Sequence, residues 1–333
     1  MVSTRSTDTG RDEAAGGGSV VIEVRDLERT FEVRRRTGRF TRQRTEVRAV
    51  HGLSFSVEAG EMVGYIGPNG AGKSTTIKML TGILVPTGGH LRVAGLDPSR
   101  HRAELARRIG VVFGQRTTLW WDLPLRDSFE LLRKIYRIPA ERHRRNLDDF
   151  VELLSLGDLL DTPVRQLSLG QRMRGDIVAA LLHDPEILYL DEPTIGLDVV
   201  SKGRLREFLR TLNAERGTTL LLTTHDLQDI EALCRRVIVI DHGTAVFDGA
   251  LSGLHTRGGS TRTLVVDLVD EVPAIDVPGA RTRRVEGPRQ WLSFPSGASA
   301  APIVAAVAAA YDVADLSIQE PDIEDVIRDL YSH

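Results

Sequence analysis

The stretch Gly67-Pro-Asn-Gly-Ala-Gly-Lys-Ser74 has the spacing of a loop that holds phosphate groups: a glycine, four residues, then glycine, lysine and serine. Glycines let successive backbone N–H groups turn toward a phosphate, and the helix that follows points the positive end of its dipole at the same place. We expect Lys73 to reach the β- and γ-phosphates and Ser74 to bind Mg²⁺. The expected nucleotide contacts are Gly67, Pro68, Asn69, Gly70, Ala71, Gly72, Lys73, Ser74 and Thr75.

A second apolar run ends in two acidic residues, Leu188-Tyr-Leu-Asp-Glu192. Such a strand end suits a site where Asp191 holds Mg²⁺ through water and Glu192 polarises an attacking water. Two acids can also simply end a strand. Because a phosphate loop precedes them in the same chain, the catalytic interpretation is favoured.

The segments around these two motifs alternate between short apolar runs and helical patterns. Strands are expected at residues 20–24, 53–57, 62–66, 186–190, 219–223 and 237–241, and a closing hairpin follows at residues 246–247. Helical periodicity is dense from about residue 102 to 182. This alternation predicts an α/β domain with a mostly parallel core sheet and a helical insert.

The pattern changes near residue 258. Strands are expected at residues 263–268, 281–285, 290–294 and 316–319, and helices at residues 300–311 and 321–331. We therefore predict three parts: a disordered tail over residues 1–19, a main domain over 20–258 and a small α+β appendix over 259–333.

Composition sets broader limits. The chain has 333 residues, 41% of them hydrophobic, and a net charge of −3, which argues against a general nucleic-acid binder. No stretch approaches the roughly 18 to 20 apolar residues of a membrane span. The single cysteine, Cys234, excludes a disulfide framework and is expected to be a small buried apolar residue.

An arginine-rich segment lies between the first two expected strands. It contains Arg34, Arg35, Arg36, Arg39, Arg42, Arg44 and Arg48. A solvated loop or hairpin is the plainer interpretation, and a surface facing anionic lipid or a membrane partner is the alternative.

The order of further motifs resembles the nucleotide-binding subunit of ATP-binding cassette (ABC) transporters, over residues 20–258. Leu167-Ser-Leu-Gly-Gln171 is similar to the family signature, Ile195-Gly-Leu-Asp198 to its D-loop and Thr224-His-Asp226 to its switch segment. Gln115 stands where the Q-loop glutamine would be, and Phe31 is the candidate for the aromatic that stacks on adenine.

This resemblance implies a P-loop NTPase cassette with an additional antiparallel β part, a helical subdomain over about residues 102–182, and ATP with Mg²⁺ as cofactors. Glu192, His225 and Gln115 would be catalytic, and Gln115 would also contact the metal.

Two such subunits, identical or different, would face each other head to tail. Each ATP would then lie between one chain's phosphate loop and the other chain's Ser168, Gly170, Gln171 and Asp198. One residue departs from the family pattern, because Leu169 replaces the usual glycine of the signature and is expected to alter close backbone approach there.

The string Phe113-Gly-Gln-Arg-Thr-Thr-Leu-Trp-Trp-Asp-Leu-Pro124 resembles a bacterial subfamily paired with separate export-type permeases, including antibiotic and viologen exporters. Trp120 and Trp121 would be core residues or a docking groove, and we expect one of them buried and the other presented.

The resemblance implies an ATPase at the cytoplasmic face of the cell membrane, powering export by membrane subunits. An importer ATPase and a soluble ABC ATPase acting on ribosomes or DNA are the alternatives.

Overall fold

The computed structural model describes residues 19–36, 42–114, 116–257, 261–295 and 297–319. At its centre is a six-stranded sheet in the order β5-β6-β7-β3-β8-β9. Its strands are β3 (Met62–Ile66), β5 (Ile109–Phe113), β6 (Ile187–Asp191), β7 (Thr219–Thr223), β8 (Arg236–Asp241) and β9 (Thr244–Ala250). All neighbours are parallel except β8 and β9, which form the expected hairpin. This confirms the α/β class.

Five of the described helices lie next to strands of this sheet in the chain. They are α1 (Lys73–Leu80), α2 (Arg102–Leu105), α6 (Val199–Arg216), α7 (Leu227–Leu233) and α8 (Leu251–Arg257). α2 precedes β5, and each of the others follows one of the strands. Because α1 follows β3 directly, the phosphate loop lies at the carboxyl edge of the sheet. β6 and β7 end at the same edge, since both are parallel to β3.

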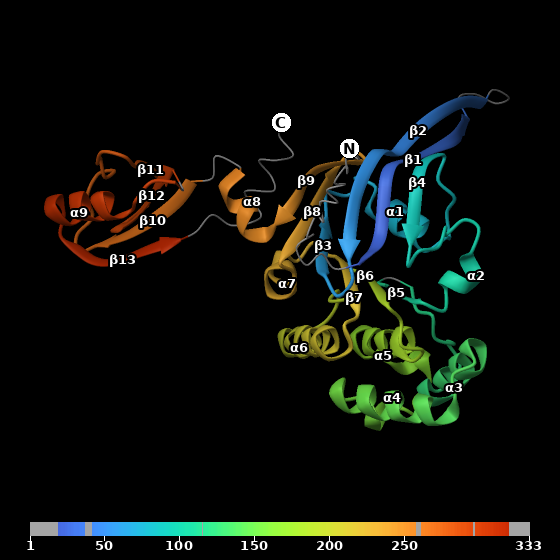
Figure 1. Cartoon of the computed structure of the whole chain (residues 1–333). Helices are drawn as coiled ribbons and strands as arrows, with labels where there is room; N and C mark the ends of the chain where they lie inside the picture. Colours follow the sequence, from blue (N-terminus) through green and yellow to red (C-terminus); the bar gives the residue numbers. More distant parts are fainter. Residues whose placement is uncertain (1–18, 37–41, 115, 258–260, 296, 320–333) are drawn as a thin grey trace, which may run out of the picture.

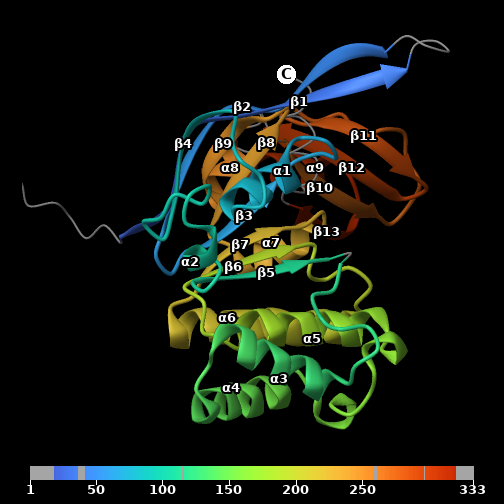
Figure 2. The ribbon, with the colours of Figure 1, turned by 90° about the vertical axis from the view of Figure 1, so that its right-hand side faces the viewer.

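A three-stranded antiparallel sheet, ordered β2-β1-β4, covers one side of the core. It consists of β1 (Val20–Arg36), β2 (Arg42–Glu58) and β4 (Gly88–Val93). β1 and β2 pair as far as Arg36 and Arg42, so the arginine-rich segment forms a hairpin, of which residues 37–41 lie outside the described part. Figures 1 and 2 show this hairpin extending clear of the other described elements. β4 was not expected from the sequence.

Helices cover the opposite side (Figure 2). They include α3 (Leu125–Tyr136), α4 (Ala140–Leu153) and α5 (Leu169–Leu181), with short 3₁₀ turns η1 (Gly157–Leu159) and η2 (Val164–Gln166) before α5. The helical region expected over about residues 102–182 differs at its start, because β5 within it pairs with β6 in the central sheet.

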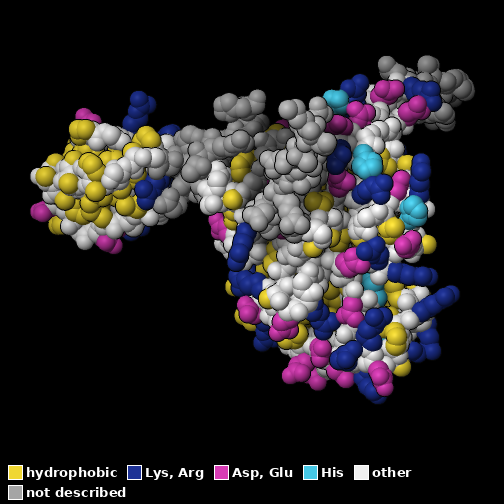
Figure 3. All heavy atoms as spheres, in the orientation of Figure 1, with side chains coloured by type: hydrophobic (Ala, Val, Ile, Leu, Met, Phe, Trp, Pro, Cys, Tyr) yellow, Lys and Arg dark blue, Asp and Glu magenta, His cyan; other side chains and the backbone are white. Residues whose placement is uncertain are grey.

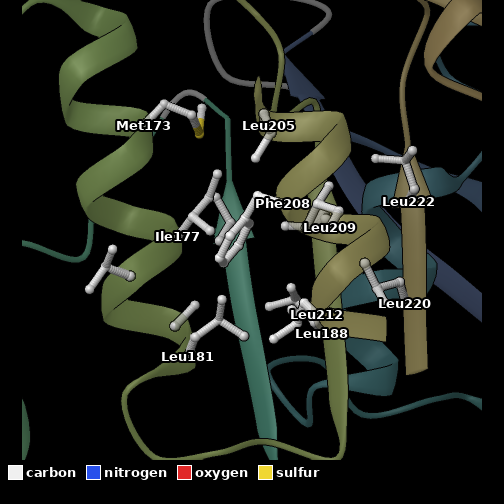
Figure 4. Packing of buried hydrophobic residues seen from close by; sticks show 14 of the residues in the cluster. Met173, Ile177, Leu181, Leu188, Leu205, Phe208, Leu209, Leu212, Leu220 and Leu222 are labelled. Atoms are coloured by element: carbon white, nitrogen blue, oxygen red, sulfur yellow. The ribbon is translucent and has the colours of Figure 1, made fainter. Parts of the chain in front are cut away.

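Apolar side chains of α5 and α6 join this helical layer to the sheet (Figure 4). Ile177 and Leu181 of α5 face Phe208 and Leu212 of α6, and all four are at most 4% exposed. Burying a side chain of this size contributes about 1.5–3 kcal/mol. Cys234 lies in the same cluster, and burial, with the charge of Asp229, raises the pKa of its thiol to about 12, as expected for an inert buried cysteine.

The C-terminal part has a separate core. Its antiparallel sheet, in the order β11-β12-β10-β13, is covered on one face by α9. The elements are β10 (Thr261–Leu268), β11 (Arg281–Glu286), β12 (Arg289–Pro295), α9 (Ala301–Ala310) and β13 (Val313–Gln319). Figure 3 shows apolar side chains over its outer end. The helix expected at residues 321–331 lies outside the described residues.

Among the described residues, no helix combines the length and the apolar character needed to cross a membrane.

Candidate nucleotide site

The phosphate loop connects β3 to α1 with two glycines in the left-handed region, Gly70 at φ 88° and Gly72 at φ 105°. Gly72 also needs its small size, because a Cβ there would lie 2.6 Å from the Ala49 carbonyl oxygen of β2. The N–H groups of the first turn of α1 have no carbonyl partner within the helix. The loop therefore presents backbone donors at a positive helix end, as an anion site requires.

Lys73 turns its ammonium group toward the loop. Its Nζ donates to the carbonyl oxygens of Gly67 at 2.5 Å and Pro68 at 3.1 Å. Burial lowers the pKa of Lys73, and the charges of Glu192 and Asp191 oppose that shift. The end of β6 therefore lies close enough to the phosphate loop for its two carboxylates to act on the charge of Lys73.

Two carboxylates and a histidine meet at the ends of β6 and β7. Asp191 Oδ1 accepts a hydrogen bond from Thr223 Oγ1 at 2.5 Å, and Glu192 Oε2 lies 2.6 Å from Nδ1 of His225. His225 has 75% of its side chain exposed, whereas Glu192 has 25%. A carboxylate held against an accessible imidazole is well placed to orient a water and to move a proton.

The residues present fit a magnesium ion. Ser74 is exposed at the start of α1, Thr75 beside it is half-buried, and Asp191 is half-buried at the strand end. The hydroxyl oxygen of Ser74 and the carboxylate oxygens of Asp191 are hard donors of the kind that Mg²⁺ prefers.

The signature begins α5. Ser168 is its N-cap: its hydroxyl accepts from the Gln171 backbone N–H at 3.2 Å, and Gln171 Oε1 accepts from the Ser168 N–H at 2.9 Å. This capping box fixes the direction in which α5 presents its first turn. Both side chains therefore have a structural role here.

Leu169 packs against the D-loop of its own chain. A Cβ on Gly196 would lie 2.3 Å from Leu169 Cδ2, and a Cβ on Gly170 would lie 2.8 Å from Leu197 Cδ2. Each leucine thus fills the space left by the other segment's glycine. The altered backbone approach expected at Leu169 concerns a nucleotide held by a second chain, and it stays a prediction.

Asp198 caps α6 with its carboxylate. It accepts from the Ser201 backbone N–H at 2.9 Å and from Ser201 Oγ at 2.7 Å, and the Ser201 hydrogen bonds lower its pKa. The following Val199 and Val200 are 86% and 64% exposed. Within the described part of the chain, no hydrogen bond connects the signature or Asp198 to the phosphate loop.

Phe31 lies half-buried on β1, with the Arg29 guanidinium 4.5 Å above its ring centroid. Its cross-strand neighbour on β2 is Val47, which is 47% exposed. Opposed residues of an antiparallel pair share a face, so Val47 extends the apolar surface of Phe31. Sequence reasoning missed Arg29 and Val47, because only the hairpin register brings them beside the aromatic ring.

Gln115 lies outside the described residues. The preceding Gly114 donates its N–H to the Asp191 carbonyl at 2.6 Å. A Cβ at Gly114 would approach the Glu192 carbonyl oxygen to 2.7 Å, so only glycine fits against the end of β6.

The segment after Gly114 is tied to α5. Asp176, 5% exposed, accepts hydrogen bonds from Thr117 Oγ1 at 2.9 Å and the Thr118 N–H at 2.8 Å. Contrary to expectation, Trp120 and Trp121 are both exposed, by 38% and 51%. The buried position of this segment belongs instead to Leu119, at 5% exposure, which joins the core against α5.

Asp176 predicts a specific pH dependence of stability. Burial raises its pKa above the ordinary 3.8, although the hydrogen bonds from Thr118 and Thr117 oppose the shift. The folded state then holds this proton more tightly than the unfolded state, so ionisation of Asp176 reduces stability as pH rises through the raised pKa. Asp176→Asn lacks this ionisation and therefore this loss of stability. The urea midpoint of Asp176→Asn minus that of the parent should therefore increase from pH 4 to pH 7.

Asp161→Asn is the control for this measurement, because the hydrogen bond and charge of Arg126 lower the pKa of Asp161. That carboxylate contributes stability that is lost as pH falls, so any small effect of its replacement has the opposite sign. A midpoint difference for Asp176→Asn that does not vary with pH would contradict the prediction.

A phosphate loop between a parallel strand and a helix, with two carboxylates at a neighbouring strand end, defines a P-loop nucleotide hydrolase. A sequence profile described as ABC transporter matches residues 50–195. The chain belongs to the ABC transporter family, as an ATP-binding subunit with ATPase activity. This confirms the resemblance and the cassette fold expected from the motifs.

Known relatives agree along most of the chain. It is 34% identical to the daunorubicin resistance ATP-binding protein DrrA2 of Streptomyces coeruleorubidus, over 86% of this chain and 92% of that protein. It is 38% identical to the Nod factor export ATP-binding protein I of Ralstonia nicotianae, over 71% of each. A dimeric ATP-binding cassette solved in a post-hydrolysis state with ADP and phosphate matches with a TM-score of 0.59 at 25% identity, over 69% of this chain and 98% of that one.

Proposed function

We propose that this chain hydrolyses ATP to power export of a drug-like or other small molecule through separate integral membrane permease subunits. It would work as one of two cassettes, identical or different, on the cytoplasmic face of the membrane, and it has no specific nucleic acid partner. The names of the relatives, daunorubicin resistance and Nod factor export, support the direction of transport.

The observation that carries the permease partnership is the double attachment of the tryptophan segment to the signature helix. Asp176 holds Thr117 and Thr118, and Arg172, the residue after Gln171, lies 5.3 Å from the ring centroid of Trp121. Exposed aromatic side chains are typical anchors of protein interfaces. A partner that moves Trp121 would therefore shift α5 and the signature at its start.

The residues of one chain have distinct roles in this proposal. Backbone N–H groups of Gly67 and of residues 69–75 hold the phosphates, and Lys73 balances the charge of the β- and γ-phosphates. Ser74, Asp191 and Gln115 would hold Mg²⁺, which would neutralise charge on the phosphates when bound.

The remaining roles concern water and the nucleoside. Glu192 orients the attacking water and accepts its proton, and His225 steadies Glu192 and the γ-phosphate. Phe31 stacks on adenine, with Val47 widening the apolar surface.

A second cassette completes the site. Ser168, Gly170, Gln171 and Asp198 would face the nucleotide of the opposite chain, adding donors where charge develops. The exposed Val199 and Val200 support this, because large apolar side chains beside the D-loop favour burial against a partner. The dimeric cassette with ADP and phosphate is a precedent among similar structures.

We also propose that residues 20–258 act as the catalytic cassette and 259–333 as an accessory domain. The separate apolar core around α9, which draws only on residues after Gly258, supports this division.

Purification of the tagged full chain from solubilised host membranes tests the proposal. We expect a multi-span permease to co-purify, and the pair reconstituted in vesicles to move cargo outward only with ATP. Trp121→Ala should reduce permease recovery at least severalfold, whereas Val285→Ala, an exposed apolar residue of β11, should not. Recovery with ribosomes or DNA and without a membrane protein would overturn the transport function, and inward movement would overturn export.

A further inference from the structure

A fully buried carboxylate lies close behind the proposed catalytic residues. Asp229 of α7, four residues after His225, is 0% exposed. Its Oδ2 accepts a hydrogen bond from Thr194 Oγ1 at 2.6 Å, and its Oδ1 accepts one from Arg206 Nε at 2.7 Å. One side chain thereby joins three separate segments: the loop after β6, helix α6 and helix α7.

Thr194 belongs to the turn that carries Glu192. Glu192 has φ 57°, in the left-handed region, which a side chain other than glycine, asparagine or aspartate rarely adopts. Such a conformation is unfavourable for glutamate and persists only when its surroundings hold it. The turn is closed by backbone bonds from Ile195 to Glu192 and from Leu197 to Thr194, and the Thr194 hydroxyl attaches it to Asp229.

Helix α6, which carries Arg206, also contacts the segment that contains His225. Asp226, directly after His225, accepts from Lys202 Nζ at 2.5 Å and caps α7 by accepting from the Gln228 N–H at 3.2 Å. Burial raises the pKa of Asp226, but the hydrogen bond and charge of Lys202 and the charge of Arg206 outweigh it, so its pKa is lowered and it stays ionised. Lys202 and Arg206 are one helical turn apart and share a face of α6.

We propose that Thr194, Asp229 and Arg206, together with the Lys202–Asp226 pair, form a brace that positions Glu192 against His225. These are positioning residues, because none of them touches the two atoms, Glu192 Oε2 and His225 Nδ1, that lie 2.6 Å apart. The inference rests on the proposed roles of Glu192 and His225. A buried ion pair by itself contributes little to stability, because the cost of desolvation offsets the attraction. We therefore assign the Asp229–Arg206 pair the role of orienting Glu192.

Thr194→Val tests the brace with nearly unchanged side-chain volume. Without the hydroxyl, the turn loses its attachment to Asp229, and Glu192 loses its fixed distance to His225. We expect kcat for ATP hydrolysis by the full chain to fall roughly ten- to a hundredfold, as for a small misplacement of a catalytic group, with KM and ATP affinity within about twofold of the parent. Thr194→Ser restores the hydroxyl and should recover most of kcat.

Lys202→Met provides an independent variant. The Lys202 side chain is partly exposed, so its replacement does not disturb a fully buried position. It should lower kcat in the same manner, whereas Arg204→Met, exposed on the same helix, should not. If Thr194→Val fails to fold, the comparison of kcat between Lys202→Met and Arg204→Met tests the brace.

The outcomes separate the brace from the proposed function. An unchanged kcat in Thr194→Val overturns the brace. If that variant does not fold, an unchanged kcat in Lys202→Met overturns it. A fall in kcat that Thr194→Ser does not recover also overturns it. Full turnover in Glu192→Gln, by contrast, would remove the proposed role of Glu192, whatever the behaviour of Thr194→Val.

Discussion

Lys73→Ala is expected to abolish ATP turnover and to weaken ATP binding severely. The ammonium group of Lys73 lies within the loop, bonded to the Gly67 and Pro68 carbonyls, where it would meet the β- and γ-phosphates. Alanine removes that charge from a partly buried site, and water cannot replace it there. Turnover measured by phosphate release and binding measured by a fluorescent ATP analogue should both fall to near background.

The matched control is Lys78→Ala, which removes an exposed lysine from the last turn of the same helix, α1. It should retain both activities, because Lys78 lies outside the phosphate loop. Substantial ATPase activity in Lys73→Ala, beside a normal control, would mean that residues 67–74 do not hold the phosphates.

Glu192→Gln is expected to bind ATP normally while hydrolysis slows by about 10²- to 10⁴-fold, the usual contribution of a positioned general base. The amide keeps the size of the side chain and an oxygen near His225 Nδ1, but it cannot accept the proton of water. Since ATP would then persist between two cassettes, size-exclusion chromatography should show a dimer that depends on ATP.

Glu207→Gln serves as the comparison, because Glu207 has 71% of its side chain exposed on α6. It should hydrolyse ATP at the parental rate and form no stable ATP-dependent dimer. Turnover in Glu192→Gln equal to that of Glu207→Gln would exclude Glu192 as the base.

Much of the central sheet could be predicted because its strands are buried on both faces. β3 and β7 have the expected bounds, and four or five of their five residues are buried, which leaves continuous apolar runs in the sequence. β4, with the half-exposed sequence Gly-Gly-His-Leu-Arg-Val, has no such run and was missed. β1 and β2 were expected to be short, because their distant halves are polar and only their pairing makes them strands.

Local periodicity was a poorer guide where apolar residues stay exposed. The apolar positions of α3 include the buried Phe129 and Leu132 but also Leu131 and Ile135, which are 38% and 59% exposed. Trp120 and Trp121 are likewise apolar side chains that remain exposed. A side chain's type sets the free energy of its burial, but neighbouring elements determine whether it is covered.

The linear order of residues was enough for the phosphate loop, the acidic strand end and the cassette fold, because a cradle for phosphates needs glycines, a lysine and a serine at fixed spacing along one turn of chain. The contacts between distant segments required the folded molecule. Glu192 contacts His225, Leu169 contacts Gly196, and Asp229 joins Thr194 to Arg206. Each contact connects segments that are distant in the sequence and adjacent in the fold. Such contacts depend on sheet order and helix packing, which no local pattern of residues encodes.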